Sequence, residues 1–173
     1  MNTAVARAAF EEFVAARSAV LIHVAYLLTG DRHDAEDLLQ VALARVAQRW
    51  GRVEDPEAYV RRTLYTQSVS RLRALSRRPR ESLGVTAAEP ARHPDDLDLR
   101  VALDQALRKL TSRQRAVLML RFYEDLSESQ TAQMLGCAVG TVKSQTRHAL
   151  SRLKALNPRL NELFEDAKEV SVP

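Results

Sequence analysis

The chain has 173 residues, 46% of them hydrophobic and 28% charged, which suffices for one ordinary domain or two small ones and excludes wholesale disorder. Five Gly and six Pro are too few for the many turns of a sandwich or barrel, so the sequence predicts an all-α protein. The formal net charge is +4, and a single cysteine excludes an internal disulfide and a cysteine-based zinc site.

Two helices are predicted at the start of the chain. Apolar residues recur at three- and four-residue steps over 10–28, and Gly30 ends that run. Asp31 is placed to cap a second helix, whose apolar stripe over 35–50 stops at Gly51. Charged residues interrupt every apolar stretch before the roughly 20 residues that cross a bilayer, and no signal peptide is recognisable. We therefore expect a cytoplasmic protein without membrane insertion.

A third helix and a tether follow. Asp55 with Pro56 is a helix start, a cap followed by proline at the first helical position, and apolar residues carry the helix toward Arg78. Residues 79–94 hold three of the six prolines and show no apolar periodicity, as expected of a tether between domains. We therefore expect a first domain over 1–78, a linker over 79–95, a second domain over 96–160 and a tail over 161–173.

The second half of the chain predicts short helices with well-marked starts. An apolar stripe over 99–110 forms the first of them. Thr111 with Gln114, and Ser127 with Gln130, both have capping-box spacing, in which each residue satisfies a backbone N–H of the other. The second half therefore predicts a compact helical domain.

The end of this half predicts a helix-turn-helix. The turn 136–138 joins the short helix begun at Ser127 to a helix with an apolar stripe over 142–156. Its outer side carries four polar residues suited to base or phosphate contacts: Lys143, Ser144, Arg147 and His148. The alternative is a three-helix structural bundle whose last helix is merely basic.

Basic residues gather in two blocks. Residues 58–80 contain seven arginines and no acid, and residues 129–161 contain five Lys and Arg and no carboxylate. Acidic residues concentrate in 31–37 and beyond 161. Two separated sites for a polyanion fit this pattern and favour nucleic acid as the partner. For either block alone, the alternative is the solvated basic face of a helical protein.

Three stretches of the sequence resemble one family. The run LTSRQRAVLMLRFYEDLSESQTAQMLGCAVGTVKSQTRHALSRLK resembles region 4 of bacterial sigma factors, especially the extracytoplasmic-function (ECF) group of the sigma-70 family. Upstream, DAEDLLQ at 34–40, followed by Trp50, resembles region 2.2, and AYVRRTLYTQSVSRLR resembles regions 2.3 and 2.4. The stretches occur in family order with no long segment between them, as in the minimal two-domain form of that family.

The resemblance implies a specificity subunit that binds core RNA polymerase at its β′ clamp and β flap, directs it to promoter DNA and helps to separate the strands. It leaves an anti-sigma factor open as a further partner. Docking on core polymerase is implied for Asp34, Asp37 and Gln40. Contacts with the proximal (−10) promoter element are implied for Arg61, Arg62, Tyr65, Thr66, Gln67, Ser70, Arg71, Arg73, Arg77 and Arg78. Contacts with the distal (−35) element are implied for Thr141, Lys143, Ser144, Arg147 and His148.

Four positions depart from the family pattern. Thr111 replaces the usual proline of region 4 and can cap a helix through its hydroxyl. Ala138 replaces the usual serine before the recognition helix, and losing that cap costs about 1 kcal/mol unless another group substitutes. Thr66 and Ser70 replace the usual Asn and Asp, and their shorter side chains leave the promoter preference open.

For Asp34, Tyr65 and Cys137, a simpler structural role competes with a functional one. Asp34 lies in the first turn of its helix, where the helix dipole favours negative charge whether or not a partner docks. Tyr65 is either a core residue or a platform on which bases stack. Cys137, a small thiol in the predicted turn, is most simply a packing residue.

Enzymatic functions are disfavoured. The four histidines show no metal-ligand spacing, and the sequence has no recognisable nucleophile with its base and no Gly-rich phosphate loop. We therefore expect a protein that is not an enzyme and needs no metal or cofactor. One rival function is an autonomous helix-turn-helix regulator, which would bind a palindromic duplex as a dimer without polymerase. The other is a partner-held interaction protein, whose basic helices bind another protein.

Overall fold

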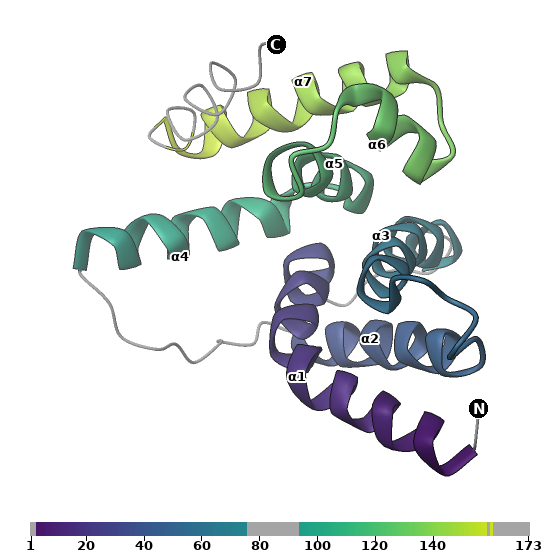
Figure 1. The fold of residues 1–173 in the computed structure, drawn as a ribbon. Helices are drawn as coiled ribbons and strands as arrows, with labels where there is room; N and C mark the ends of the chain where they lie inside the picture. Colours follow the sequence, from purple (N-terminus) through teal and green to yellow (C-terminus); the bar gives the residue numbers. More distant parts are fainter. Residues whose placement is uncertain (1–2, 76–93, 159, 161–173) are drawn as a thin grey trace. The chain divides into compact units, whose positions relative to one another are not determined.

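The computed structural model describes residues 3–75, 94–158 and 160 (Figure 1). Every regular element in those ranges is helical, which confirms the all-α prediction. The chain divides into two compact units, which we call the first unit (Met1–Arg78) and the second unit (Pro79–Pro173). The predicted linker up to residue 93 and the predicted tail lie outside the described residues, and the helix that follows the linker begins at Pro94.

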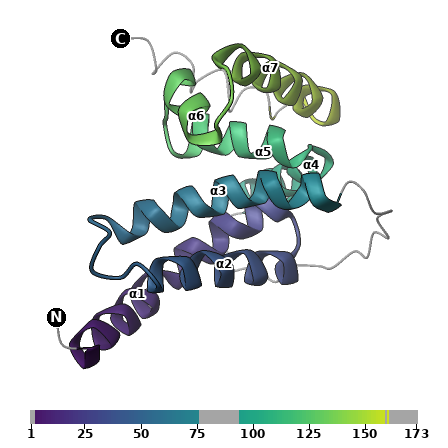
Figure 2. The ribbon, with the colours of Figure 1, turned by 90° about the vertical axis from the view of Figure 1, so that its right-hand side faces the viewer.

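The first unit is a packed set of three helices, α1 (Thr3–Thr29), α2 (Arg32–Ala47) and α3 (Pro56–Leu75). Each helix contacts the other two, and Figure 2 shows them lying side by side. The faces turned toward one another supply the core: Leu21, Val24, Ala25, Leu28, Ala35, Leu38, Leu39, Ala42, Val46, Val60, Leu64 and Tyr65. The apolar stripes of the sequence thus become the shared interior of the three helices.

Local capping chemistry sets the predicted helix boundaries in this unit. Gly30 adopts a left-handed backbone with φ 76°, which ends α1. The Asp31 carboxylate accepts a hydrogen bond of 3.0 Å from the backbone N–H of Asp34 and caps α2. The Asp55 carboxylate does the same for the N–H of Ala58 at the start of α3, also at 3.0 Å. The predicted starts of α2 and α3 are confirmed.

The predicted extension of α2 to Trp50 is wrong. The helix ends at Ala47, and the chain turns through Gly51, whose φ is 81°. The Trp50 ring then lies against two phenyl rings of α1, with centroids 5.2 Å from Phe10 and 5.4 Å from Phe13. An apolar residue at helical spacing is therefore also compatible with a turn, in which its ring packs in an aromatic cluster.

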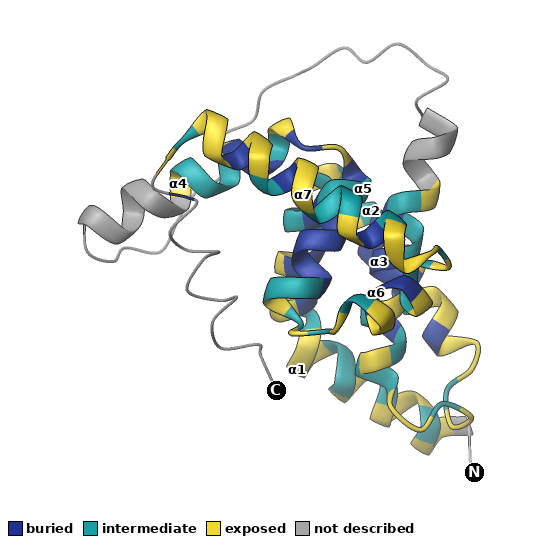
Figure 3. Cartoon of the chain, turned by 90° about the horizontal axis from the view of Figure 1, so that it is seen from above, coloured by how far each residue is buried: buried dark blue, intermediate teal, exposed yellow. Residues whose placement is uncertain are grey.

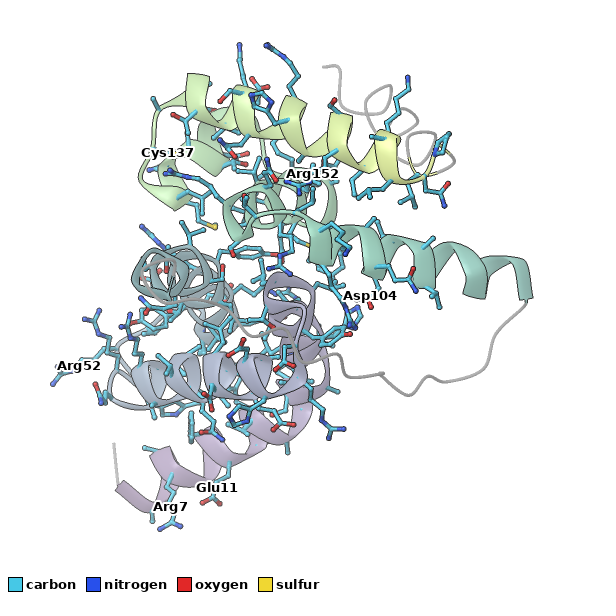
Figure 4. All side chains as sticks on the ribbon, turned by 180° about the vertical axis from the view of Figure 1, so that it is seen from behind. Arg7, Glu11, Arg52, Asp104, Cys137 and Arg152 are labelled. Carbon is cyan, nitrogen blue, oxygen red and sulfur yellow. The ribbon has the colours of Figure 1, made fainter. Side chains whose placement is uncertain are left out.

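By length and composition alone, α1 could cross a membrane over Ala4–Thr29, contrary to the expectation that charges interrupt such stretches. Its charged residues lie mostly in its first turns, where Arg7 and Glu11 pair at 2.8 Å, and the Glu11 carboxylate raises the pKa of the Arg7 guanidinium (Figure 4). Its later turns bury Leu21 and Val24 completely against the other helices. A core helix of a soluble protein passes the same length test.

The second unit contains α4 (Pro94–Lys109), α5 (Ser112–Leu118), the π-helical turn η1 (Met119–Tyr123), α6 (Glu128–Leu135) and α7 (Val139–Leu156). Helix α7 packs on α4, α5 and α6, and the buried positions in Figure 3 follow these contacts. The core residues are Ala106, Leu107, Leu110, Ala116, Val117, Leu118, Met119, Leu120, Ala132, Val142, Ala149, Leu153 and Leu160.

Both predicted capping boxes are present. The Thr111 hydroxyl accepts from the N–H of Gln114 at 3.2 Å, and the Gln114 side chain accepts from the N–H of Thr111 at 3.1 Å. Ser127 and Gln130 exchange the same two bonds at 3.2 and 2.8 Å. Thr111 therefore caps its helix as its hydroxyl predicts.

Candidate functional surfaces

The helix-turn-helix is formed by α6, the turn 136–138 and α7. Gly136 has φ 61°, a left-handed conformation that ends α6, and the N–H of Cys137 donates to the carbonyl of Ala132 at 3.0 Å. Cys137, labelled at this turn in Figure 4, packs against the cluster of Val117, Ala132 and Val142. The packing role predicted for its thiol is confirmed. The turn is thereby fixed both by backbone conformation and by burial.

The outer face of α7 carries the residues that the sequence assigned to the distal element. Lys143, Arg147 and His148 are exposed, whereas Thr141 and Ser144 are half-buried. The Ser144 hydroxyl donates to the Thr141 carbonyl at 3.0 Å. The opposite side of the helix is buried in the core of the second unit. The five residues thus lie on the accessible side of the recognition helix, with three long polar side chains projecting from it.

An acid lies next to this basic face. The Glu128 carboxylate in the first turn of α6 is 3.7 Å from the Lys143 ammonium, with the two side chains 37% and 60% exposed. The acid-free stretch of sequence begins at Ser129, one residue after Glu128. Sequence reasoning missed this acid because Glu128 and Lys143 lie on different helices, and only the turn between α6 and α7 brings them together.

Helix α3 presents fewer of its predicted DNA contacts than the sequence implied. The Arg61 guanidinium lies 3.1 Å from the Glu57 carboxylate, and the other oxygen of Glu57 lies 3.0 Å from Arg17 of α1. The Arg61 side chain is only 21% exposed. Glu57 thus links α3 to α1 through two arginines, and the contact of Arg61 with promoter phosphates stays a prediction.

Tyr65 is a core residue. Its side chain is fully buried, together with Val60 and Leu64 of the same helix. A ring with no exposed surface cannot stack on a base without rearrangement of the unit. The assignment of Tyr65 to the proximal element is therefore corrected, and of its two competing roles the structure supports packing.

The remaining predicted residues of α3 have mixed exposure. Arg62 and Ser70 are exposed, whereas Thr66 and Gln67 are half-buried. The Thr66 hydroxyl donates to the Arg62 carbonyl at 2.9 Å, which leaves its oxygen as an acceptor on the surface. The side chains of Arg71 and Arg73, and the whole of Arg77 and Arg78, lie outside the described residues.

The predicted docking residues of α2 do not share one environment. Asp34 and Asp37 are half-buried, and Gln40 is exposed. The carboxylate that caps α2 belongs to Asp31, so Asp34 has only the favourable position in the first turn and not the cap itself. Gln40 is therefore the most accessible of the three.

An open groove of about 390 Å³ runs between α1 and α2. Its lining is mostly apolar and consists of Ser18, Ala19, Ile22, Glu36, Leu39, Gln40 and Leu43. Of the three predicted docking residues, Gln40 is the one that lines it. Sequence reasoning missed the α1 wall, because which residues of α1 lie opposite α2 depends on how the two helices pack.

The described ranges contain no candidate metal site. No group of three or more His, Cys, Asp or Glu side chains lies close enough there to hold an ion. His23, His33 and His148 are each exposed, on α1, α2 and α7 respectively. His93 lies outside the described residues.

Comparison with known proteins covers both units. The family model for sigma-70 region 2 matches residues 13–78, and that for sigma-70 region 4 matches residues 100–153. The RNA polymerase sigma-E factor of Streptomyces coelicolor is 40% identical over 152 residues, which cover 84% of each chain. The ECF RNA polymerase sigma factor SigL of Mycobacterium tuberculosis is 33% identical over 170 residues, 94% of this chain and 92% of that one.

A solved structure gives the same result. The sigma factor RpoE of Bartonella quintana, crystallised in complex with the anti-sigma factor NepR, superposes with a TM-score of 0.62 at 25% identity. The superposition covers 85% of this chain and 95% of that one. Because relatives at this level of identity extend over both units, the chain belongs to the ECF group of the sigma-70 family of RNA polymerase sigma factors.

Proposed function

We infer that this sigma factor binds core RNA polymerase and directs it to promoters by using each of its two units for a separate promoter element. One observation carries this inference: a helix-turn-helix with an exposed basic face is joined in one chain to a three-helix unit that matches sigma region 2. An autonomous regulator needs the first of these features but not the second.

Reconstituted transcription tests this function. The chain with bare core polymerase should start transcription from a subset of a promoter library, whereas core alone should not. The regulator alternative predicts that the chain alone footprints a palindromic duplex and adds no initiation to core. Initiation that requires both the chain and core excludes that alternative.

For the distal element, we propose direct contact through the outer face of α7. The N-terminal half of a recognition helix reaches base edges in the major groove, and Lys143 and Arg147 lie on the exposed side of that half of α7. Thr141, Ser144 and His148 flank them and are suited to phosphate or base contacts. Among these residues Arg147 is the best candidate for a bidentate contact with guanine.

For the proximal element, we propose contact through the exposed side of α3. Arg62 is placed to hold phosphate, and Thr66, Gln67 and Ser70 offer short polar groups to bases. Arg71, Arg73, Arg77 and Arg78 continue the same basic block in the sequence and remain part of this proposal.

Substitutions in α7 and in α3 should affect different steps of initiation. Lys143→Ala with Arg147→Ala should weaken distal recognition by about 1–3 kcal/mol for a bidentate base contact, and strand opening should still occur once the polymerase is bound. Thr66→Ala with Ser70→Ala should instead change which proximal sequences open. Permanganate footprinting on paired promoter variants measures both effects, with Lys154→Ala at the far end of α7 as the control. An unchanged opening preference in the Thr66 and Ser70 variant would leave α3 with phosphate contacts only.

For polymerase docking, we propose that the β′ clamp contacts α2 through Gln40 and the groove beside it. The groove offers apolar surface, while Glu36 at its edge and Asp34 and Asp37 near the start of α2 supply negative charge for a basic partner. The β flap would contact the second unit.

A steric block tests this docking site. Ala19 lines the groove, so Ala19→Tyr should obstruct it and weaken binding to core polymerase at least about tenfold. Ala9→Tyr is the matched control, because Ala9 is exposed on the same helix and does not line the groove. Equal core affinity of both variants in a titration would remove the groove from the interface.

The cellular setting follows from these partners. As a transcription initiation factor, the chain would act in the cytoplasm, where core polymerase and promoter DNA are found, and would contribute binding surfaces without catalytic residues. The structural relative bound to NepR supports an anti-sigma factor as a further partner. We further propose that residues 79–93 separate the two units as a linker, which limited proteolysis of the free protein tests.

A further inference from the structure

Glu128 is the feature of the second unit that the proposed function does not use. It lies in the first turn of α6, and its carboxylate is 3.7 Å from the ammonium of Lys143 in the recognition helix. In a helix-turn-helix the first helix crosses the DNA backbone while the second enters the groove. The pair of Glu128 with Lys143 would therefore lie beside phosphates, where the carboxylate neutralises lysine charge that would otherwise attract them.

We propose that Glu128 is a positioning residue that acts through Lys143 and lowers the affinity of the second unit for duplex DNA of any sequence. This inference rests on the proposed contact of α7 with promoter DNA. The carboxylate competes with phosphate for the Lys143 ammonium, so that recognition depends mainly on Arg147 and the other residues of α7.

The opposite effect, in which Glu128 strengthens binding by holding Lys143 in place, is weaker on physical grounds. At 3.7 Å, with Lys143 60% exposed, the pair lacks the short charge-assisted hydrogen bond that would fix a flexible lysine. A pair this loose still neutralises part of the Lys143 charge, so that less of it is available to attract phosphate. The net effect of Glu128 is therefore to weaken binding.

A purely structural role for Glu128 is the competing explanation. Negative charge in the first turn of α6 interacts favourably with the helix dipole. The capping box of Ser127 with Gln130 satisfies the end of α6 independently of Glu128. A structural role would change the stability of the second unit, but it would leave the salt dependence of DNA binding unchanged.

The test compares variants of the full chain as holoenzyme with core polymerase. Binding to a promoter duplex and to a non-promoter duplex of equal length is measured over a salt series for Glu128→Gln, Lys143→Ala and the double variant. Asp125→Asn is the matched control: Asp125 is exposed three residues upstream, and Asn tolerates its left-handed backbone with φ 51°. It removes the same charge without touching Lys143.

Glu128→Gln should bind both duplexes about fivefold more tightly at about 0.1 M salt, with a log–log salt slope steeper by about 0.9, the value for one additional phosphate contact. The gain should grow about threefold as salt falls from about 200 to about 50 mM. In the Lys143→Ala background most of the gain should disappear. The control should bind like the unaltered protein.

Two results overturn the proposal. One is an unchanged affinity and slope in Glu128→Gln, and the other is an equal gain with and without Lys143. Failure of the proposed function is distinguishable from both, because it would appear in the unaltered holoenzyme as equal affinity for promoter and non-promoter duplexes and no initiation.

Discussion

The basic side chains of helices α3 and α7 differ in their exposure and in their acidic neighbours. In α3, Arg61 is largely covered and lies against Glu57, which also binds Arg17 of α1. In α7, Lys143 and Arg147 project into solvent, and the acid near Lys143 comes from another helix. A positive charge in the sequence is therefore available to a polyanion only where the tertiary structure leaves it exposed.

The two units also differ in how well their buried hydroxyl groups are hydrogen-bonded. In the first unit, Thr63 and Ser68 are buried, and each donates to a backbone carbonyl of its own helix, at 2.9 and 2.8 Å. In the second unit, Thr131 is fully buried, and its hydroxyl has no hydrogen-bond partner among the described residues. The interior of the first unit is thus better satisfied than that of the second at these positions.

The largest expected effect tests the core role of Tyr65. Tyr65→Ala should lower the free energy of unfolding of the first unit by about 3–5 kcal/mol, because it leaves a cavity, whereas Tyr65→Phe should cost about 1 kcal/mol. Trp50 is the single tryptophan and packs within the first unit, so its fluorescence during urea unfolding reports on that unit alone. Unchanged stability with altered promoter opening in Tyr65→Ala would restore its assignment to DNA.

The next effect should be a gain in stability in the second unit. Thr131→Val removes a buried hydroxyl without a partner and should stabilise the unit by about 1–2 kcal/mol. Thr63→Val in the first unit is the matched control, because its hydroxyl is bonded, and it should give no gain. Thermal unfolding followed by far-UV circular dichroism measures both. Equal shifts for the two variants would remove the contrast between the units.

A smaller gain is expected at the start of α7. Ala138 has an extended backbone with φ −72° and ψ 148°, as an N-cap requires, but no side chain caps the helix. Ala138→Ser should therefore stabilise the second unit by about 1 kcal/mol. Ala138→Val, which enlarges the side chain without adding a hydroxyl, is the control, because valine caps a helix as poorly as alanine. Hydrogen exchange of the α7 amides is the measurement. A gain of equal size in the valine variant would show that capping is not its cause.

The smallest effects should distinguish Arg61 from Arg62. Arg62→Ala should reduce the magnitude of the salt slope of promoter binding by about 0.9 and leave the first unit stable, because its side chain is exposed. Arg61→Ala should leave the slope unchanged and cost about 0.5–1 kcal/mol of stability through the lost pair with Glu57. Holoenzyme binding over a salt series, with Trp50 fluorescence for stability, gives both quantities. The reverse outcome would show that Arg61 leaves Glu57 to bind DNA.

Sequence alone predicted the features that depend on neighbouring residues. The caps at Asp31, Asp55, Thr111 and Ser127 are local hydrogen bonds, and each marks a helix start that the structure confirms. The outward direction of Lys143 and Arg147 also followed from the helical period, because the opposite stripe of α7 had to be buried. The family followed from motif order, which needs no geometry.

Tertiary structure decided what depends on contacts between elements. Tyr65 has the same spacing whether it faces the core or DNA, and only the packing of three helices buries it. The wall that α1 contributes to the groove and the approach of Glu128 to Lys143 also join residues from different helices. Periodicity determines which face of a helix is apolar, but it does not determine which partner each side chain meets, because that depends on how the helices pack.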